Sequence, residues 1–229
     1  MPAESQPLIQ ALSRIDTPTL SNAVEQLKVR NRVSGFADLS LRCMNPRLGI
    51  MCGFAVTAQA VTMAPQPGNR ERAVSRLIEI CEALQALPGP GVVVIQEAGP
   101  HADFATHCGD VMATLFQKFG GIGVVSDAGV RDLDEVSSLG FHIFARGLVA
   151  SHAHFEIVRV NDPVTVGGLP ISSGDLLHGD LNGLIKVPEE GREELPRLAT
   201  EVTERESGLQ DHIRSKGATL ESIYERFTH

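Results

Sequence analysis

The sequence predicts an α/β protein, and three observations support this class. Segments with the apolar patterns of strands and helices alternate over residues 54–147, which predicts a mostly parallel sheet. Residues 156–187 have the pattern of antiparallel strands with tight turns, which suggests a second sheet layered on the first. The 229 residues include 22 glycines and no tryptophan, which suits an α/β chain with many turns.

The N-terminal region, residues 1–30, is expected to be helical. Residues 9–15 predict a short helix, and a second one starts near Thr17. Thr17 is a suitable N-cap, with Pro18 at the first helical position, where its missing N–H costs nothing. The expected buried face of this second helix consists of Leu20, Ala23, Val24 and Leu27.

The next part of the chain predicts a strand over residues 54–63, a helix over 70–87 and a buried strand over 92–95. Asn69 can cap that helix. The apolar stripe expected on the helix consists of Val74, Leu77, Ile78, Cys81 and Leu84.

The segment 108–132 is the one around which the chain is organised. A helix over residues 111–119 is followed by Gly120-Gly121 and a strand over 122–125. A helix of about ten residues advances about 15 Å, and the strand with its flanks returns about the same distance. Gly109-Asp110 and Arg131-Asp132 should therefore meet at one edge of one sheet.

The rest of the chain completes one domain. A short helix over residues 133–139 and a strand over 141–145 follow the central segment, and residues 189–227 are charged and helical in period, with expected breaks at Gly191, Pro196, Gly208 and Gly217. We expect a single domain over residues 1–229, divided into N-terminal helices (1–30), a layered sheet core (53–187) and a C-terminal helical arm (189–229).

Charge and hydropathy exclude several partners. The formal charge of −8 and the pI near 5.5, without any basic run, argue against nucleic acid, which needs clustered Lys and Arg. No segment approaches the about 18 apolar residues that span a bilayer, and the N-terminus lacks the pattern of a secretory signal. We therefore expect no membrane association and a cytoplasmic location.

The four cysteines are widely spaced and form no CxxC pair. A zinc site or a disulfide framework is therefore not expected. Buried, reduced thiols are the favoured interpretation.

Gly109-Asp110 at a helix start offers free N–H groups and the positive end of the helix dipole, which suit a small carboxylate. Asp110 can also be simply a first-turn acid that this dipole favours. Arg131 can hold a carboxylate or ketone oxygen through two parallel hydrogen bonds. A structural salt bridge to Asp127 or Asp134 is the alternative.

Asp132 can ligate Mg²⁺ or Mn²⁺, which take carboxylate and water oxygens. It can also cap the helix that begins at Leu133. A metal, an arginine and an anion-binding helix start at one strand end suit a 2-keto acid, which chelates the metal while the enolate forms. This chemistry is metal-dependent aldol cleavage or decarboxylation of a β-keto acid.

Twenty residues separate Asp110 from Arg131-Asp132, with GD at the start of the interval and GVRD at its end. This spacing resembles the 4-hydroxy-4-methyl-2-oxoglutarate aldolase family, which is related to the regulator of ribonuclease activity A. The likeness extends from about Thr17 to the C-terminal helix. It includes GFAVTAQAV near residue 53 and SGDLLHGDLNGLIKVPEE near residue 173.

The resemblance implies a layered β/β/α sandwich, similar to swivelling domains, assembled as a homotrimer or hexamer. It implies a class II pyruvate aldolase that depends on Mg²⁺ or Mn²⁺, cleaves a 4-hydroxy-2-oxo acid through a metal-stabilised pyruvate enolate, and also decarboxylates oxaloacetate. The expected partners are therefore a small 2-oxo acid and further copies of the chain.

The resemblance also implies site residues. Four backbone amides would cradle the pyruvyl carboxylate. These belong to Gly109, Asp110, Val111 and Met112. Arg131 would bind substrate and steady the enolate, while Asp110 would position a water that acts as acid or base. Asp132 would hold the metal, largely through water, and Glu206 or Glu204 from a neighbouring subunit would complete its shell.

Some positions depart from the family's pattern. Asn22 stands where many members have an aspartate. His101 and His107 lie near the predicted site, where they either tune substrate choice or are ordinary exposed loop histidines. His152 and His154 have the spacing of ligands on one side of a strand, but the sequence places no acid or cysteine beside them.

A Schiff-base aldolase and a noncatalytic regulator are the alternatives to the metal-dependent aldolase. A Schiff-base aldolase needs a lysine in an apolar pocket, and Lys186 is the one lysine on an expected strand, where a solvent-facing position is its ordinary interpretation. A noncatalytic regulator that binds an RNA-processing enzyme is the alternative outside enzymes. The regulator branch of the family does not keep the metal-binding acid, whereas Asp132 is present in this chain, which favours the enzyme.

Overall fold

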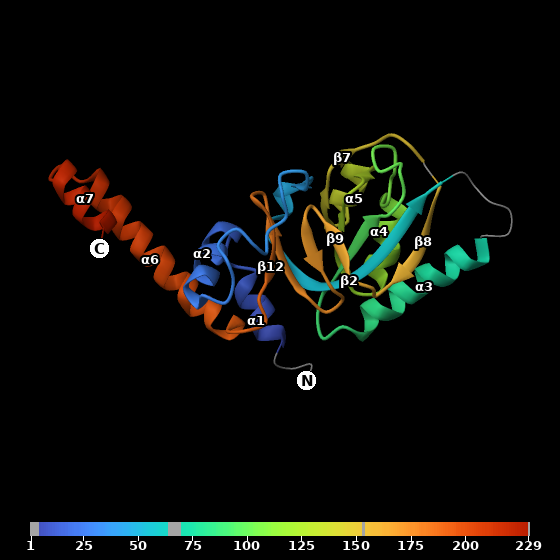
Figure 1. Cartoon of the computed structure of the whole chain (residues 1–229), viewed down its shortest axis with the longest axis horizontal. Helices are drawn as coiled ribbons and strands as arrows, with labels where there is room; N and C mark the ends of the chain where they lie inside the picture. The colour runs from blue at the N-terminus through green and yellow to red at the C-terminus, as the bar shows by residue number, and fades with distance from the viewer. Residues whose placement is uncertain (1–4, 64–69, 153, 229) are drawn as a thin grey trace.

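The structure is a computed structural model that describes residues 5–63, 70–152 and 154–228, and an eight-stranded sheet forms its centre (Figure 1). The strand order is β1, β6, β4, β3, β2, β11, β12, and β8 also pairs with β2. The strands are β1 (Arg42–Cys43), β2 (Met51–Thr62), β3 (Gly91–Glu97), β4 (Gly121–Ser126), β6 (His142–Ala145), β8 (Phe155–Val160), β11 (Leu176–Asp180) and β12 (Gly183–Val187). Strands β2, β3, β4 and β6 run parallel, as predicted.

The antiparallel strands mostly extend this sheet instead of forming a second one. Strand β2 is twelve residues long and pairs with β11 near its start and with β8 near its end. Only the hairpin of β9 (Val164–Val166) and β10 (Leu169–Ile171) lies apart and packs against β2 and β3. The second layer is therefore smaller than the sequence suggested. A further short parallel pair joins β5 (Gly129–Val130) to β7 (Gly147–Leu148).

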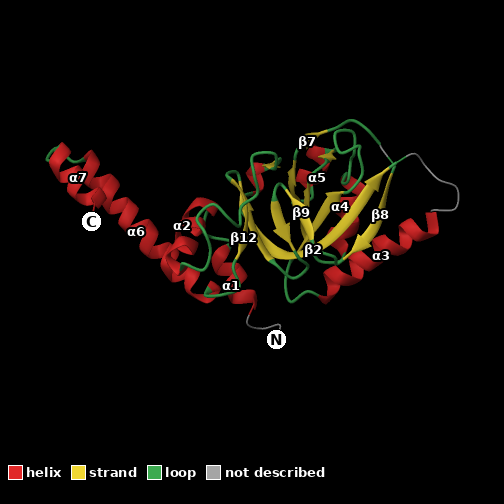
Figure 2. Ribbon diagram, in the orientation of Figure 1, coloured by secondary structure: helices red, strands yellow, loops and turns green. Residues whose placement is uncertain are grey.

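Both faces of the parallel strands are buried, which gives three layers (Figure 2). Along β3, Val93 and Ile95 pack with the helix side of the core, whereas Val92 and Val94 pack with the β9–β10 hairpin. The helices on this side are α3 (Arg70–Ala86), α4 (Asp110–Lys118) and α5 (Leu133–Ser138). Hairpin, sheet and helices confirm the predicted β/β/α layering.

A separate cluster of buried apolar side chains joins the N-terminal helices to the β12 edge of the sheet. Helices α1 (Ser5–Leu12) and α2 (Thr17–Leu27) pack with α6 (Leu195–Arg214) beside β11 and β12. The predicted face of α2 is buried through Leu20, Ala23 and Val24. Its N-cap is Asp16, whose side chain accepts from Thr19 N at 3.0 Å, so the prediction of Thr17 was wrong by one residue. Thr17 N instead donates to Asp180 Oδ2 at 2.8 Å.

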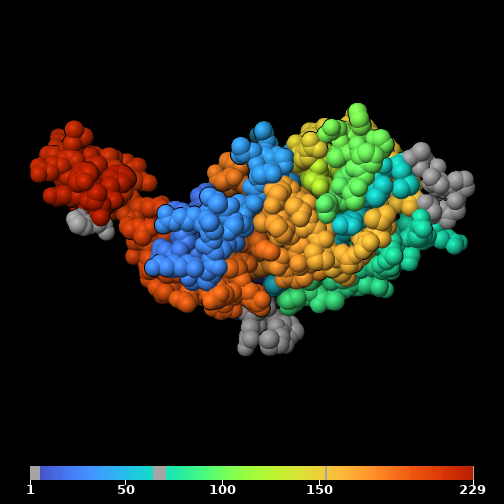
Figure 3. Space-filling model, viewed as in Figure 1, coloured from blue at the N-terminus to red at the C-terminus, as the bar shows by residue number. Residues whose placement is uncertain are grey.

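The C-terminal arm projects from the body of the molecule (Figure 3). Helix α6 runs unbroken through Pro196 and Gly208, so the expected breaks at these residues were wrong. Pro196 lies in the first turn, where no hydrogen bond is lost, and a single exposed glycine costs a helix only about 1 kcal/mol. Gly217 lies between α6 and α7 (Leu220–Thr228). The described part of the chain also contains two 3₁₀ turns, η1 (Pro46–Leu48) and η2 (Arg192–Glu194).

The fold also bears on the expected stripe of α3 and on the cysteines. Val74 and Ile78 of the predicted α3 stripe are about half exposed, whereas Ile80 is fully buried, so the buried face is rotated from the expected one. The predicted cap Asn69 lies outside the described residues. All four cysteines are free thiols; three are buried, as expected, whereas Cys43 is only half-buried. Within the described ranges, no helix is long and apolar enough to cross a bilayer.

The cap of α2 gives a stability prediction. Replacing Asp16 with alanine leaves Thr19 N without its acceptor and should lower the free energy of unfolding by about 1 kcal/mol. Urea unfolding measures this loss. Asp211→Ala, which removes an exposed acid from α6, is the control and should cost less than about 0.5 kcal/mol. Equal losses in the two variants would show that the cap contributes nothing.

Candidate active site

The predicted convergence of Gly109-Asp110 with Arg131-Asp132 is confirmed. The backbone before α4 runs beside the backbone after β4, and Gly129 N donates to Ala105 O at 3.0 Å. His107 N donates to Gly129 O and Arg131 N donates to Cys108 O, both at 3.1 Å. The two segments follow β3 and β4, so the site lies at the carboxyl ends of neighbouring parallel strands, where open α/β sheets bind ligands.

Charged groups meet closely at the start of α4. Asp132 Oδ2 lies 3.2 Å from Arg131 Nε and accepts from Asp110 N at 3.4 Å. Asp110 Oδ1 accepts from Val111 N at 2.7 Å. Two amides of the helix start thus hold protein carboxylates, which is what the positive end of a helix dipole favours. A Cβ on Gly109 would lie 2.4 Å from Asp132 Oδ2, so this contact requires glycine.

The structural alternative for Arg131 is wrong, whereas the alternative for Asp132 holds for its position at the helix start but not for its side chain. The ion pair of Arg131 is with Asp132, not with Asp127 or Asp134. Asp132 does occupy the N-cap position of α5, but its side chain makes no capping hydrogen bond. Its backbone is left-handed, with φ 56° and ψ 42°, which is strained for a residue with a Cβ. In this conformation the carboxylate accepts from Asp110 N at the start of α4 and not from the amides of its own helix.

A pocket of about 530 Å³ opens at this point. All four residues whose amides were predicted to bind carboxylate line it, together with Arg131. Leu77 and Phe155 add apolar surface, and His152 and His154 complete the wall. The pocket therefore combines an anion-binding end with an apolar side, which suits a small organic acid.

The donors at this end of the pocket fit a hydrated divalent ion. Asp110, which lines the pocket, and Asp132, which pairs with the lining residue Arg131, offer the carboxylate oxygens that Mg²⁺ and Mn²⁺ take, and the Asp132 side chain is about one third exposed. The thiol of Cys108 does not compete, because burial, followed by the charges of Asp132 and Asp110, raises its pKa to about 12. Among the described residues, no three His, Cys, Asp or Glu side chains gather as metal ligands.

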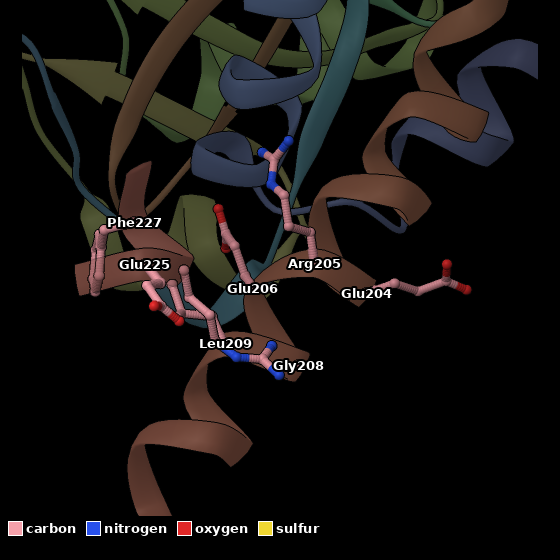
Figure 4. Close-up of a pocket in the computed structure, with 8 residues that line it drawn as sticks. Glu204, Arg205, Glu206, Gly208, Leu209, Glu225 and Phe227 are labelled. Carbon is pink, nitrogen blue, oxygen red and sulfur yellow. The ribbon is translucent and has the colours of Figure 1, made fainter. Parts of the chain in front are cut away.

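Glu206, the predicted ligand from a neighbouring subunit, lies on α6. There Asn22 Nδ2 donates to Glu206 Oε1 at 3.0 Å. Helix α6 packs near β12, at the opposite sheet edge from β1, and three strands separate β12 from β4. Glu204 and Glu206 both line a hollow between α6 and α7, and their side chains point to different sides of the helix (Figure 4). Within one chain, neither glutamate belongs to the pocket of Arg131.

The sequence did not identify a buried pair beside the pocket. His107 is fully buried, so the expectation of an exposed loop histidine was wrong, while His101 is exposed. His107 Nε2 lies 3.0 Å from Glu97 Oε2, and both side chains are inaccessible to solvent. An acid at the end of β3, ten residues before a histidine that precedes the helix start, was the available signal.

Glu97 is ionised despite its burial. Desolvation opposes the charge, but hydrogen bonds from His107, the Thr62 hydroxyl and the amides of Thr62 and Gly99 outweigh it and lower the pKa of Glu97 to about 2. Thr62 N and Gly99 N donate to Oε1 at 2.9 and 2.8 Å, and Thr62 Oγ1 donates to Oε2 at 2.6 Å. A carboxylate with this many donors remains charged at neutral pH.

The chain belongs to the family described as RraA-like: Aldolase/RraA, whose profile matches residues 17–186. This finding confirms the family that the resemblance suggested. The match covers both the loop before α4 and the Arg131-Asp132 pair.

Individual relatives give the same result. A Halalkalibacterium halodurans protein, provisionally named 4-hydroxy-4-methyl-2-oxoglutarate aldolase, is 30% identical over 139 residues, 58% of this chain and 66% of that protein. An Ectopseudomonas mendocina protein with the same provisional name is 33% identical over 107 residues, 45% of this chain and 64% of that protein. The aligned segments thus span just under two thirds of these relatives.

A solved structure shares the fold. Streptomyces coelicolor RraAS2, described as an unusual member of the RNase ES inhibitor RraA family, superposes with a TM-score of 0.69. The comparison covers 90% of this chain and 96% of that one, at 23% identity. At this identity the likeness supports the fold alone.

Glu97 predicts a specific acid dependence of stability. Its pKa of about 2 lies below the ordinary value near 4.5, so its contribution is complete above about pH 5 and is lost as the pH falls toward 2. The expected loss is about 3 kcal/mol. Denaturant unfolding of wild type and Glu97→Gln between pH 7 and pH 2.5 should show the stability gap narrowing by most of this amount. A constant gap would contradict the assignment.

The strained backbone of Asp132 gives a second prediction. Asp132→Gly and Asp132→Ala both remove the carboxylate, but only glycine relieves the left-handed conformation. We expect the glycine variant to be more stable than the alanine variant by about 1 kcal/mol in thermal unfolding. Equal stability of the two would mean that the conformation is not strained.

Proposed function

We propose that this protein is a divalent-metal-dependent class II pyruvate aldolase, which cleaves a 4-hydroxy-2-oxo acid and also decarboxylates oxaloacetate. The observation that carries the proposal is the meeting of the α4 start with Arg131 and Asp132 at one end of the pocket. The names of two relatives support the aldolase activity, and 4-hydroxy-4-methyl-2-oxoglutarate is the corresponding substrate.

Each residue has a defined task in this proposal. Amides at the start of α4, from Gly109 to Met112, bind the carboxylate of the 2-oxo acid, displacing the protein carboxylates that now hold two of them. Arg131 donates to the 2-oxo oxygen and stabilises the negative charge that grows there. Asp110 holds the water that takes the proton from the C4 hydroxyl.

Bond cleavage then follows. As the hydroxyl proton passes to this water, the C3–C4 bond breaks and the C4 fragment leaves as a carbonyl compound. The electron pair of that bond passes into the pyruvate enolate, which takes a proton from the water at C3. In oxaloacetate the corresponding bond releases CO₂ and leaves the same enolate. A divalent metal held by Asp132 and water would supply a Lewis acid that stabilises this negative charge.

The proposal includes a cytoplasmic homo-oligomer. One chain offers two carboxylates to a metal that usually has six oxygen ligands, and water need not supply all the others. Glu206 of a neighbouring copy remains our prediction for a further ligand. Asn22 Nδ2 donates to Oε1 of this glutamate and so orients its carboxylate on α6.

A Schiff-base mechanism has less support. No lysine occurs among the described residues that line the pocket. Lys186, the strand candidate, donates from Nζ to Asp175 Oδ2 and Pro170 O, both at 3.0 Å, and so already has two partners.

Pyruvate release from 4-hydroxy-4-methyl-2-oxoglutarate and from oxaloacetate tests the proposal. Both reactions should require Mg²⁺ or Mn²⁺, stop with EDTA, and resume when metal is restored. Arg131→Ala and Asp132→Ala should each lower kcat/KM by about 10²–10³, because each removes an electrostatic contact to the developing charge.

Arg159→Ala is the matched control for Arg131→Ala, because Arg159 is an exposed arginine on β8 that also pairs with an aspartate, Asp162. The loss of Arg159 should leave kcat/KM unchanged. Metal-loaded protein that releases no pyruvate from either acid would contradict the proposal. In that case a noncatalytic regulator that binds an RNA-processing enzyme is the remaining function. Trapping of a pyruvate adduct by borohydride would instead support the Schiff-base mechanism.

A further inference from the structure

One buried side chain, His107, connects the two segments that form the pocket. Its backbone N–H donates to Gly129 O, which joins the loop before α4 to the segment before Arg131. Its ring is fully buried and uses both nitrogens, so the residue is held from the backbone and from the side chain together.

On one side the ring is fixed to β3. The Oε2 atom of Glu97 lies 3.0 Å from Nε2 and also accepts from the Thr62 hydroxyl. The other oxygen of Glu97 accepts hydrogen bonds from two backbone amides. A carboxylate only accepts hydrogen bonds, so each of these partners must supply a hydrogen. Because Glu97 is ionised, Nε2 carries the hydrogen of this contact.

On the other side the ring is fixed to β4. The Nδ1 atom lies 2.8 Å from the hydroxyl of Ser126, the last residue of that strand. Ser126 Oγ also accepts from Ala128 N at 3.0 Å, which shapes the turn that leads to Arg131. The imidazole therefore spans from the end of β3 to the end of β4, directly beneath the site.

We infer that His107 is a positioning residue, which sets the distance between the amides at the start of α4 and the Arg131-Asp132 pair. Two residues separate its anchored ring from Asp110. Its effect on turnover rests on the proposed function, whereas its effect on the loop does not.

His107 borders the pocket, but its ring has no exposed surface with which to contact a substrate. Both nitrogens are engaged, the side chain has no exposed surface, and the ring of Phe155, which lines the pocket, packs against it with centroids 5.2 Å apart. The inference therefore concerns geometry and not proton transfer.

His107→Gln tests the inference, because a glutamine can keep one of the two contacts but cannot span from Glu97 to Ser126. Two measurements are made well below the unfolding temperature. Amide hydrogen exchange at Gly109, Asp110 and Val111 should become at least tenfold faster. The Kd of oxalate in the presence of Mg²⁺, measured by calorimetry, and the KM for oxaloacetate should each rise about tenfold, with a smaller change in kcat.

His178→Gln is the matched control. His178 is also fully buried and also uses both nitrogens, with Thr17 Oγ1 at 3.1 Å and Leu12 O at 3.2 Å, but it lies in the cluster around α1 and α2. The His178→Gln variant should lose about as much stability as His107→Gln. Its amide exchange in the loop, its Kd for oxalate and its KM for oxaloacetate should stay unchanged. If His107→Gln does not fold, Ser126→Ala replaces it, because this variant removes only the contact of His107 to β4. Ser126→Ala should likewise raise the rate of loop amide exchange, the Kd of oxalate and the KM for oxaloacetate.

The outcomes distinguish a failure of the positioning role of His107 from a failure of the proposed function. Faster loop exchange together with weaker oxalate binding supports the inference. Unchanged exchange in both His107→Gln and Ser126→Ala overturns it, even if activity falls, because the histidine is then not what holds the loop. A wild-type protein that turns over no 2-oxo acid contradicts the proposed function, while the exchange result still decides the role of His107.

Discussion

The site depends on one backbone interaction, the pairing of residues 105–108 with residues 129–131. Three hydrogen bonds between these segments bring the start of α4 to the Arg131-Asp132 pair. Without them, two loops that follow different strands would each have to be ordered separately. Fixing the backbone of each residue costs about 1–2 kcal/mol in conformational entropy. The glycine contacts, the Asp132 conformation and the buried Glu97-His107 pair all depend on, or reinforce, this pairing.

The pairing also explains why so few side chains are needed. The anion-binding groups are backbone amides at a helix start, which any sequence can supply once the loop is fixed. Specific side chains are then required at Arg131 and Asp132, and the absence of one at Gly109, where a Cβ would lie 2.4 Å from Asp132 Oδ2. The chemical groups lie at the surface of the pocket, whereas the groups that fix their geometry lie beneath it.

The sequence predicted the helix–strand unit well, because its apolar periods and Gly120-Gly121 are local signals. It also predicted that the ends of this unit meet, since that follows from element lengths alone. It did not predict the Glu97-His107 contact, because the pairing of a buried acid with a buried histidine depends on a loop path that no local pattern encodes. Nor did it predict that β8 and β11 would share β2, since the pairing of distant strands is set by the whole sheet.

A crystal structure of the protein with oxalate and Mn²⁺ tests the central claim most directly, because manganese is located by its anomalous signal. Our account predicts manganese beside the Asp132 carboxylate, with one oxalate carboxylate against the amides at the start of α4 and Arg131 within hydrogen-bond distance. Oxalate and manganese bound elsewhere, or a pocket that stays empty at saturating oxalate, would contradict it.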